Sequence, residues 1–185
     1  DYKGMKIRFA GLGGKVLEKL GASVTMMPGG ELYQALEKGT IDATEFSMPA
    51  IDQILGFDQV VKYNLFPGWH QQFTAQYMLI NQDEWNKASK AQKALVEASC
   101  TAATTRGLAE GEYKNGAVLA GFQDKGVHAD QIPREVLEKL KAVTEQVLEE
   151  EAGKDADFKR VYESQQAFME TYKVWDERAY LPADL

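Results

Sequence analysis

The residue that most invites a chemical explanation is Glu45, in the stretch GGELYQALEKGTIDATEF at residues 29 to 46. It follows an extended Thr-Ile-Asp-Ala-Thr run and stands directly before Phe46. A carboxylate that becomes buried is costly unless another group compensates its charge. Glu45 is therefore either exposed to solvent or held beside a cationic partner.

Other residue types offer little for catalysis. Neither a G-x-S-x-G nor an H-E-x-x-H motif occurs, and the only histidines are His70 and His128. Cys100 is the single cysteine, so an intramolecular disulfide and a thiolate metal cluster are excluded. Its setting in ALVEASCTAATT resembles a small-residue helix face, which predicts a packed and inert thiol.

Composition limits the classes of protein further. The chain has 185 residues, of which 44% are hydrophobic and 26% charged, as in ordinary globular proteins. Its net charge of -7 and pI near 5.0 argue against nucleic-acid binding. No apolar run is long enough to span a bilayer. The sequence begins at Asp1 without the features of a signal peptide, which predicts either a cytosolic protein or one whose signal has been removed.

The elements that must position Glu45 alternate between strand and helix. Residues 5–11 and 22–28 read as strands that flank a helix at residues 14–21, which is a βαβ unit. A second helix from Glu31 to Lys38 ends before Gly39, the expected left-handed cap, and residues 40–46 extend again. The predicted fold class is α/β with parallel strands.

The remainder is mostly helical. We expect one more strand at residues 73–82, a long helix over residues 89–122 and a helix with Pro133 in its first turn. The last helix carries a stripe in steps of four and three, which packs either inside the chain or against a second copy. Its members are Val161, Gln165, Phe168, Tyr172, Trp175 and Ala179.

The GLGG stretch at residues 11–14 raises the question of nucleotide binding. The third position of the dinucleotide fingerprint is Val16 rather than glycine, and no P-loop lysine follows. Two interpretations remain. The helix start binds a small anion through its backbone N–H groups, or the glycines serve only a tight turn.

Three ordered stretches resemble one family: KIRFAGLGGKVLEKLGA, PGGELYQALEKGTIDATEF and LGFDQVVKYNLFPGWHQ. They are similar to the C-terminal half of the substrate-binding proteins of tripartite ATP-independent periplasmic (TRAP) transporters, in the branch that binds 2-oxo acids and related monocarboxylates. The resemblance implies a two-lobe fold of the periplasmic binding protein type, with this chain as mainly the second lobe. Residues 1–44 and 76–185 would form that lobe with its C-terminal helices. Residues 45–75 would cross to the largely missing first lobe.

The resemblance also implies a binding site. Arg8 matches an arginine whose planar fork of donors holds the ligand carboxylate bidentately. Glu45 and the main-chain oxygen of Phe46 match the ligands of a cation, sodium or calcium, and Gln71 could add a neutral oxygen. Trp69 would form an apolar wall.

This sequence departs from the family pattern at two places in that site. Phe46 stands where close relatives carry tryptophan, which removes an indole donor and changes the pocket volume. After the Pro-Gly-Trp motif, relatives often carry a second tryptophan and an acid, whereas this chain has His70 and Gln71.

The implied function is that of an extracytoplasmic binding protein, not an enzyme, which delivers a small 2-oxo or 2-hydroxy monocarboxylate to TRAP permease subunits. The expected location is the periplasm, and a homodimer through the C-terminal helix is possible. The alternative from another class is a metal-dependent enzyme acting on 2-oxo acids, with Glu45 holding the ion.

Plainer roles for the same residues remain open. Arg8 could pair with a surface acid such as Asp42, Trp69 could belong to the core, and His70 could lie at the surface. Asp42 and Asp52 are expected to be hinge or capping residues.

Overall fold

A small parallel sheet forms the N-terminal part of the chain in the computed structural model, which describes residues 2–181. Its strand order is β2-β1-β3, with β1 at Lys6–Arg8, β2 at Ser23–Thr25 and β3 at Ala43–Thr44. Both pairings of β1 are parallel. Helix α1 (Gly11–Lys19) connects β1 to β2, and a short 3₁₀ turn η1 (Gly29–Glu31) followed by α2 (Leu32–Glu37) connects β2 to β3. The predicted βαβ order is confirmed, although each strand is shorter than expected.

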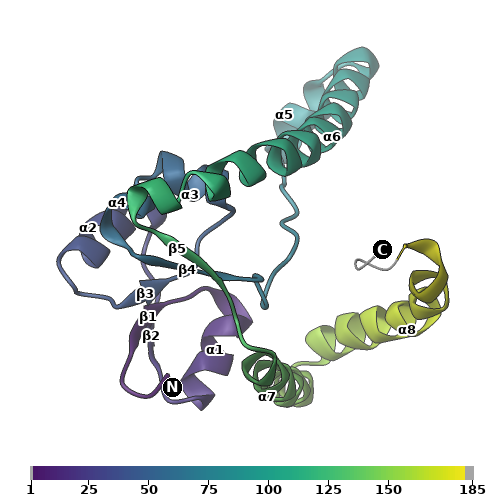
Figure 1. Cartoon of the computed structure of the whole chain (residues 1–185). Coiled ribbons are helices and arrows are strands. Elements are labelled where there is room, and N and C mark those ends of the chain that lie inside the picture. Colours follow the sequence, from purple (N-terminus) through teal and green to yellow (C-terminus); the bar gives the residue numbers. More distant parts are fainter. Residues whose placement is uncertain (1, 182–185) are drawn as a thin grey trace.

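The core beneath this sheet joins the two ends of the sequence. Ile7, Val16 and Leu17 pack with Leu140 and Val147, all almost fully buried. The last two belong to α7 (Arg134–Lys154), which packs against α1 (Figure 1). Burial of large aliphatic side chains stabilises such a contact by about 1.5–3 kcal/mol each. The late helix is therefore fixed to the first strand and helix.

A second group of elements lies beyond β3. It contains α3 (Pro49–Ile54), α4 (Phe57–Val60), β4 (Tyr63–Phe66), α6 (Lys90–Ala120), η2 (Gln123–Lys125) and β5 (His128–Gln131). Strands β4 and β5 pair in parallel as a separate two-stranded sheet. Asn115 on α6 accepts a 3.0 Å hydrogen bond from the Ala50 N–H on α3, and Lys125 pairs with the buried Asp58 at 2.5 Å.

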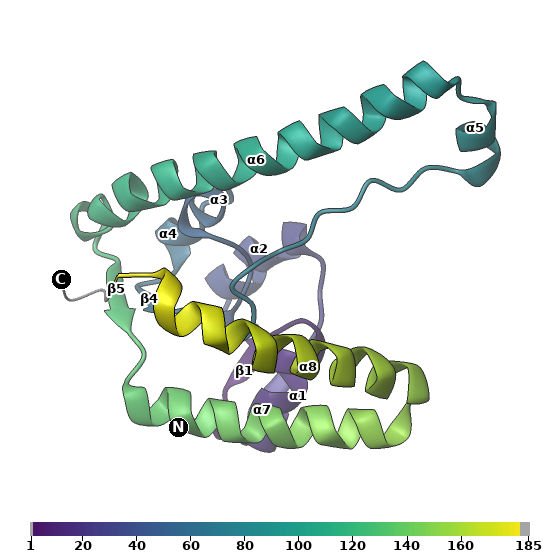
Figure 2. The same ribbon diagram turned by 90° about the vertical axis from the view of Figure 1, so that its right-hand side faces the viewer.

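This packing bears on the predicted lobe boundaries. Helix α6 and strand β5, which the prediction assigned to the lobe of residues 1–44, contact the segment predicted to cross away from it. Helix α7 returns to α1, and α8 (Ala156–Ala179) packs on α7 (Figure 2). The division into lobes remains a prediction.

Two sequence-based expectations fail along residues 73–100. No strand forms at residues 73–81, and the next element is the short helix α5 (Gln82–Lys87). Cys100 is exposed rather than packed. Both outcomes fall where the N-terminal half of α6 projects from the main body of the molecule (Figure 2). The contact described for Cys100 there is Met78 Sδ at 4.0 Å, and Met78 is itself exposed.

The two C-terminal helices form where the sequence predicts them. Pro133 stands just before α7 rather than within its first turn, and Asp155 caps α8 (Ala156–Ala179) through the Phe158 N–H. Gly39 has the expected left-handed conformation, with φ of 67°. The stripe on α8 is largely open to solvent, since Val161, Phe168 and Trp175 are all exposed. Among the described residues, no helix has both the length and the apolar character needed to cross a membrane.

Candidate functional site

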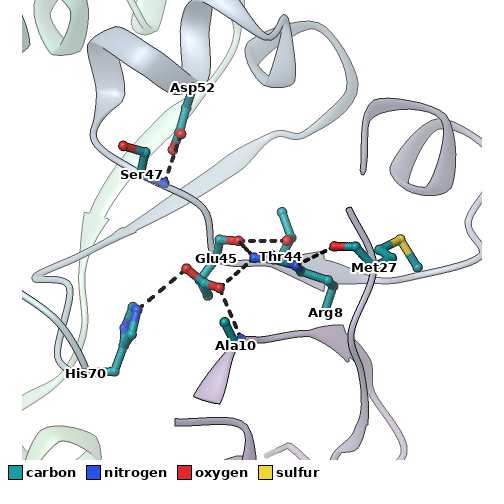
Figure 3. Close-up of polar contacts among 8 residues, drawn as sticks. All are labelled: Arg8, Ala10, Met27, Thr44, Glu45, Ser47, Asp52 and His70. Carbon is teal, nitrogen blue, oxygen red and sulfur yellow. Dashed lines mark hydrogen bonds and ion pairs between the residues drawn. The ribbon is translucent and has the colours of Figure 1, made fainter. Parts of the chain in front are cut away.

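Polar groups converge where the three parallel strands end. Arg8 is the last residue of β1, Glu45 follows β3, and Met27 lies just after β2 (Figure 3). The carboxyl ends of adjacent parallel strands lie at one edge of a sheet, the usual place for a ligand site in α/β proteins. The strand order with β1 in the middle therefore brings Arg8 to the centre of the site.

The guanidinium of Arg8 is directly paired with Glu45. Its Nη1 donates to Glu45 Oε1 at 2.6 Å and to the Glu45 main-chain oxygen at 2.8 Å, while Nε donates to the Met27 carbonyl at 3.3 Å. The Arg8 side chain is only 8% exposed, so these acceptors compensate a nearly buried charge. The partner is thus Glu45 and not Asp42, which instead accepts the Lys6 N–H.

This pairing differs from the fork expected of Arg8. Two of its three nitrogens already have partners, and Nη2 is the one that makes none of the hydrogen bonds described for it. A carboxylate ligand would meet one uncommitted nitrogen instead of two parallel donors. Bidentate binding would require the Met27 or Glu45 contact to be shared or released.

The carboxylate of Glu45 has two oxygens in different surroundings. Oε1 accepts from Arg8 and from the Ala10 N–H at 3.1 Å, whereas Oε2 faces His70 Nε2 at 3.6 Å. Partial burial would raise the pKa of Glu45, but His70, the charge of Arg8 and the Ala10 N–H together lower it. Glu45 is therefore an ionised carboxylate with one oxygen fixed and the other less engaged.

The same contact answers the question raised by the GLGG stretch. Ala10 is the N-cap of α1, and its N–H points to Glu45 Oε1. A helix start favours a negative charge, and here the charge described at it is the protein's own carboxylate. The anion described at this helix start is therefore the Glu45 side chain of the same protein and not a separate small ion.

An aromatic group flanks this carboxylate. Phe9 contacts His70 edge to face at 4.5 Å between ring centroids and stacks on Trp69 at 5.6 Å. Trp69 is half-buried and packs against the core, so its predicted roles as core residue and as ligand wall are compatible. On the other side, the Phe46 ring lies 5.9 Å from the Arg8 guanidinium carbon and meets Phe57 edge to face.

Gly13 makes room for these rings. A β-carbon at Gly13 would lie 2.3 Å from Phe9 Cε1 and 3.3 Å from His70 Cβ. We expect Gly13→Ala to lower the free energy of unfolding by about 1–3 kcal/mol through this overlap, partly offset by the helix propensity of alanine. Chemical denaturation would measure the change.

Gly116→Ala is the matched control for that variant. Gly116 also lies inside a helix, but a β-carbon there would meet no atom within 4 Å. This change should raise stability by up to about 1 kcal/mol. If both variants were stabilised alike, Gly13 would not be required by the aromatic packing.

Gln71 is not brought to the carboxylate. Its described contact is Thr74, whose hydroxyl accepts from Gln71 Nε2 at 2.7 Å in exposed surroundings. The described part of the chain holds no cluster of three or more His, Cys, Asp or Glu side chains suited to a metal ion. A cation beside Glu45 would therefore depend on its Oε2, on main-chain oxygens and on oxygens of the ligand.

Asp52 lies near this site and accepts the Ser47 N–H at 3.1 Å, the local capping role expected for it. Burial raises its pKa to about 6, the Ser47 hydrogen bond opposes the rise, and the charge of Glu45 adds to it. Because this folded-state pKa lies above the ordinary value of 3.8, the protonated group favours the folded chain. That contribution is complete below the ordinary value and disappears as the pH rises through about 6.

We therefore expect the carboxyl resonance of Asp52 to titrate with a midpoint near pH 6. Asp52→Asn should remove the corresponding fall in stability between about pH 4 and about pH 6. Denaturant unfolding across that range would show it. A midpoint near that of an ordinary aspartate would mean that the carboxyl is solvated.

A cavity of about 420 Å³ lies beside the site and shares Phe46 as one of its lining residues. Arg8 and Glu45 do not line it, but Asp52 and Asp58 do. One oxygen of Asp58, Oδ1, is buried without a described partner, while the other binds Lys125. The cavity is thus separate from the Arg8 and Glu45 pair.

Sequence reasoning named the charged residues Arg8 and Glu45 but missed two main-chain groups that contact them. The Ala10 N–H and the Met27 carbonyl carry no residue-type signal, and their position follows only from the alignment of the three strand ends. The spacing at Gly13 could have suggested a close contact, but not with which rings.

Fold and site together define a class of protein: an α/β binding domain with a paired arginine and glutamate at the carboxyl ends of its parallel strands. A family model described as bacterial extracellular solute-binding protein, family 7, matches residues 1–155. The chain belongs to this family.

Most of this chain is similar to proteins that are named or solved as solute-binding proteins. A monocarboxylate 2-oxoacid-binding periplasmic protein of Nostoc sp. (strain PCC 7120) is 33% identical over 95% of this chain and 48% of its own length. A TRAP periplasmic solute-binding protein of Colwellia psychrerythraea, solved with bound calcium and pyruvate, is 32% identical with a TM-score of 0.86, covering 97% of this chain and 56% of that one. Another from Pseudoalteromonas atlantica T6c, with bound sodium and pyruvate, is 30% identical at the same TM-score of 0.86, over 95% and 54%.

These comparisons establish the fold as that of TRAP periplasmic binding proteins. The chain spans about half the length of the relatives it matches.

Proposed function

We propose that this chain is part of an extracytoplasmic solute-binding protein that captures a small 2-oxo or 2-hydroxy monocarboxylate together with a cation. The protein would act in the periplasm and pass its ligand to TRAP permease subunits. The observation that carries the proposal is the Arg8 and Glu45 pair at 2.6 Å, placed where three parallel strands end.

Charge balance explains why a cation belongs in the proposal. The Arg8 guanidinium and the Glu45 carboxylate cancel, so an organic acid would add an uncompensated negative charge to a partly buried site. Sodium would restore neutrality, and calcium would leave one positive charge. Solved relatives hold pyruvate with one or the other of these ions.

The residues of this site would make separate contacts with the acid and the cation. Arg8 Nη2 would donate to the acid, and Glu45 Oε2 with the Phe46 main-chain oxygen would hold the cation. Trp69 and Phe46 would border the apolar part of the ligand. Gln71 would join only if its side chain turned away from Thr74.

Two further points, on catalysis and on dimerisation, belong to the same proposal. The family consists of solute-binding proteins, and we propose that this chain likewise lacks catalytic activity. The apolar side chains exposed on α8, among them Phe168 and Trp175, would suit a homodimer contact.

Calorimetric titration of the full-length protein with pyruvate and with lactate, in calcium, in sodium and without added ion, tests the function. We expect a dissociation constant in the range of about 1 μM, or about -8 kcal/mol, and dependence on the ion. Turnover of either acid would favour the metal-dependent enzyme. Absence of heat with every acid and ion would refute the binding function.

A further inference from the structure

The side chain of His70 faces Oε2 of Glu45, the oxygen of that carboxylate for which no hydrogen bond is described. Its Nε2 lies 3.6 Å from Glu45 Oε2, and the His70 side chain is 20% exposed. The other oxygen, Oε1, is held by Arg8 and Ala10. The carboxylate therefore cannot rotate freely, and it presents Oε2 toward the imidazole.

The distance of 3.6 Å between His70 Nε2 and Glu45 Oε2 indicates which kind of contact the two atoms can make. It exceeds the range of about 2.7–3.2 Å for an N–H···O hydrogen bond. Two ligands at about 2.1 Å from a tetrahedral metal lie about 3.4 Å apart. The gap thus suits two lone pairs directed at one ion better than a donor directed at an acceptor.

Aromatic packing holds the imidazole in this position. Phe9 meets the His70 ring edge to face at 4.5 Å, and Trp69 does so at 5.5 Å. Gly13 runs close beside this side chain, since a β-carbon there would lie 3.3 Å from His70 Cβ. A side chain whose orientation is fixed by its neighbours loses little entropy when it ligates a metal.

We propose that His70 Nε2 is a further ligand of the cation bound at Glu45, and that it extends the site to borderline divalent metals such as Zn²⁺ and Co²⁺. Imidazole nitrogen suits these ions, whereas calcium and sodium sites are built from oxygen. Glu45 and His70 would supply two donors, and the carboxylate and 2-oxo oxygens of the acid would supply two more. The inference rests on the proposed function for the presence of the acid, but His70 and Glu45 alone define its metal test.

Co²⁺ is the probe, because its visible absorption reports nitrogen coordination and low coordination number. The full-length protein would be titrated with CoCl₂ alone and then with pyruvate. The variants are His70→Ala, His70→Gln, which keeps an oxygen donor, and the control His128→Ala. His128 is the other histidine; it lies in β5 and stacks on Tyr63 of β4, away from Glu45. Circular dichroism would verify that each variant is folded.

We expect His70→Ala to weaken Co²⁺ binding by at least about tenfold, the lower end of the cost of losing even an outer-shell partner of a metal. The absorption band should change, and calcium affinity measured by competition should change far less. His70→Gln should behave like His70→Ala toward Co²⁺, and His128→Ala like the original protein.

Each contrary outcome has its own meaning. Lack of Co²⁺ binding, or binding that His70→Ala leaves unchanged or strengthens, would overturn the ligand role of His70, even if pyruvate still bound with calcium. Failure of pyruvate to bind with any ion would refute the proposed function, and the Co²⁺ titration would still decide whether His70 is a ligand.

Discussion

Arg8→Ala should weaken pyruvate binding by about 2–5 kcal/mol, which is about 30-fold to about 5,000-fold in the dissociation constant. The acid would lose the only cationic side chain described at the carboxyl ends of β1 and β3. The variant would also leave Glu45 as a partly buried carboxylate without its guanidinium. Calorimetry with the full-length protein, at saturating calcium, is the measurement.

The loss must be separated from unfolding. Arg134→Ala is the matched control, because the Arg134 side chain is 92% exposed and its described partner is Glu138, one turn away on α7. Exposed pairs of this kind contribute little, so we expect unchanged binding and stability. A loss of less than a few-fold in folded Arg8→Ala would mean that another group holds the acid.

Glu45→Gln should remove most of the dependence of acid binding on the cation. In the original protein, we expect the ion and the acid to strengthen each other by about 5-fold to 150-fold, the usual range for coupled ligands. An amide can still accept from Arg8 and Ala10 through its oxygen, but it does not attract a cation as a carboxylate does. At saturating calcium, the variant should bind pyruvate more weakly than the original protein.

Without added ion the order should reverse. The amide leaves the charge of Arg8 uncompensated, so the ion-free variant should bind the acid more tightly than the ion-free original protein. Glu110→Gln is the control, since Glu110 is also a carboxylate between two basic side chains, Arg106 and Lys114, but on the exposed helix α6. Equal ion dependence in the original protein and Glu45→Gln would remove the cation from this site.

Local sequence patterns determined the order of the elements and the type of the charged residues. Alternation and helical spacing predicted the parallel βαβ unit, and Gly39 marked the end of α2. The long helix over residues 89–122 was also predicted within a few residues, because Ser89 and Gln92 form a capping box that lies within four residues. Such signals depend on neighbours in the chain, so they can be recognised without the tertiary structure.

Burial was predicted less well where it depends on distant parts of the chain. The predicted strand at residues 73–82 has apolar residues of strand type, but it meets no other strand. Cys100 lies on a helix face with small residues, yet the contact described for it is Met78, which is itself exposed. A pattern states which residues could be buried, whereas only packing decides which of them are.

The sequence by itself determined that an arginine would lie on the first strand and that a glutamate would lie near the end of the third extended stretch. Only the tertiary structure decided that Arg8 and Glu45 pair directly, that the start of α1 binds Oε1, and that His70 faces Oε2. The physical reason is that these contacts join groups 25 to 37 positions apart, and their distances follow from the order β2-β1-β3 and the packing of Phe9 against Trp69 and His70.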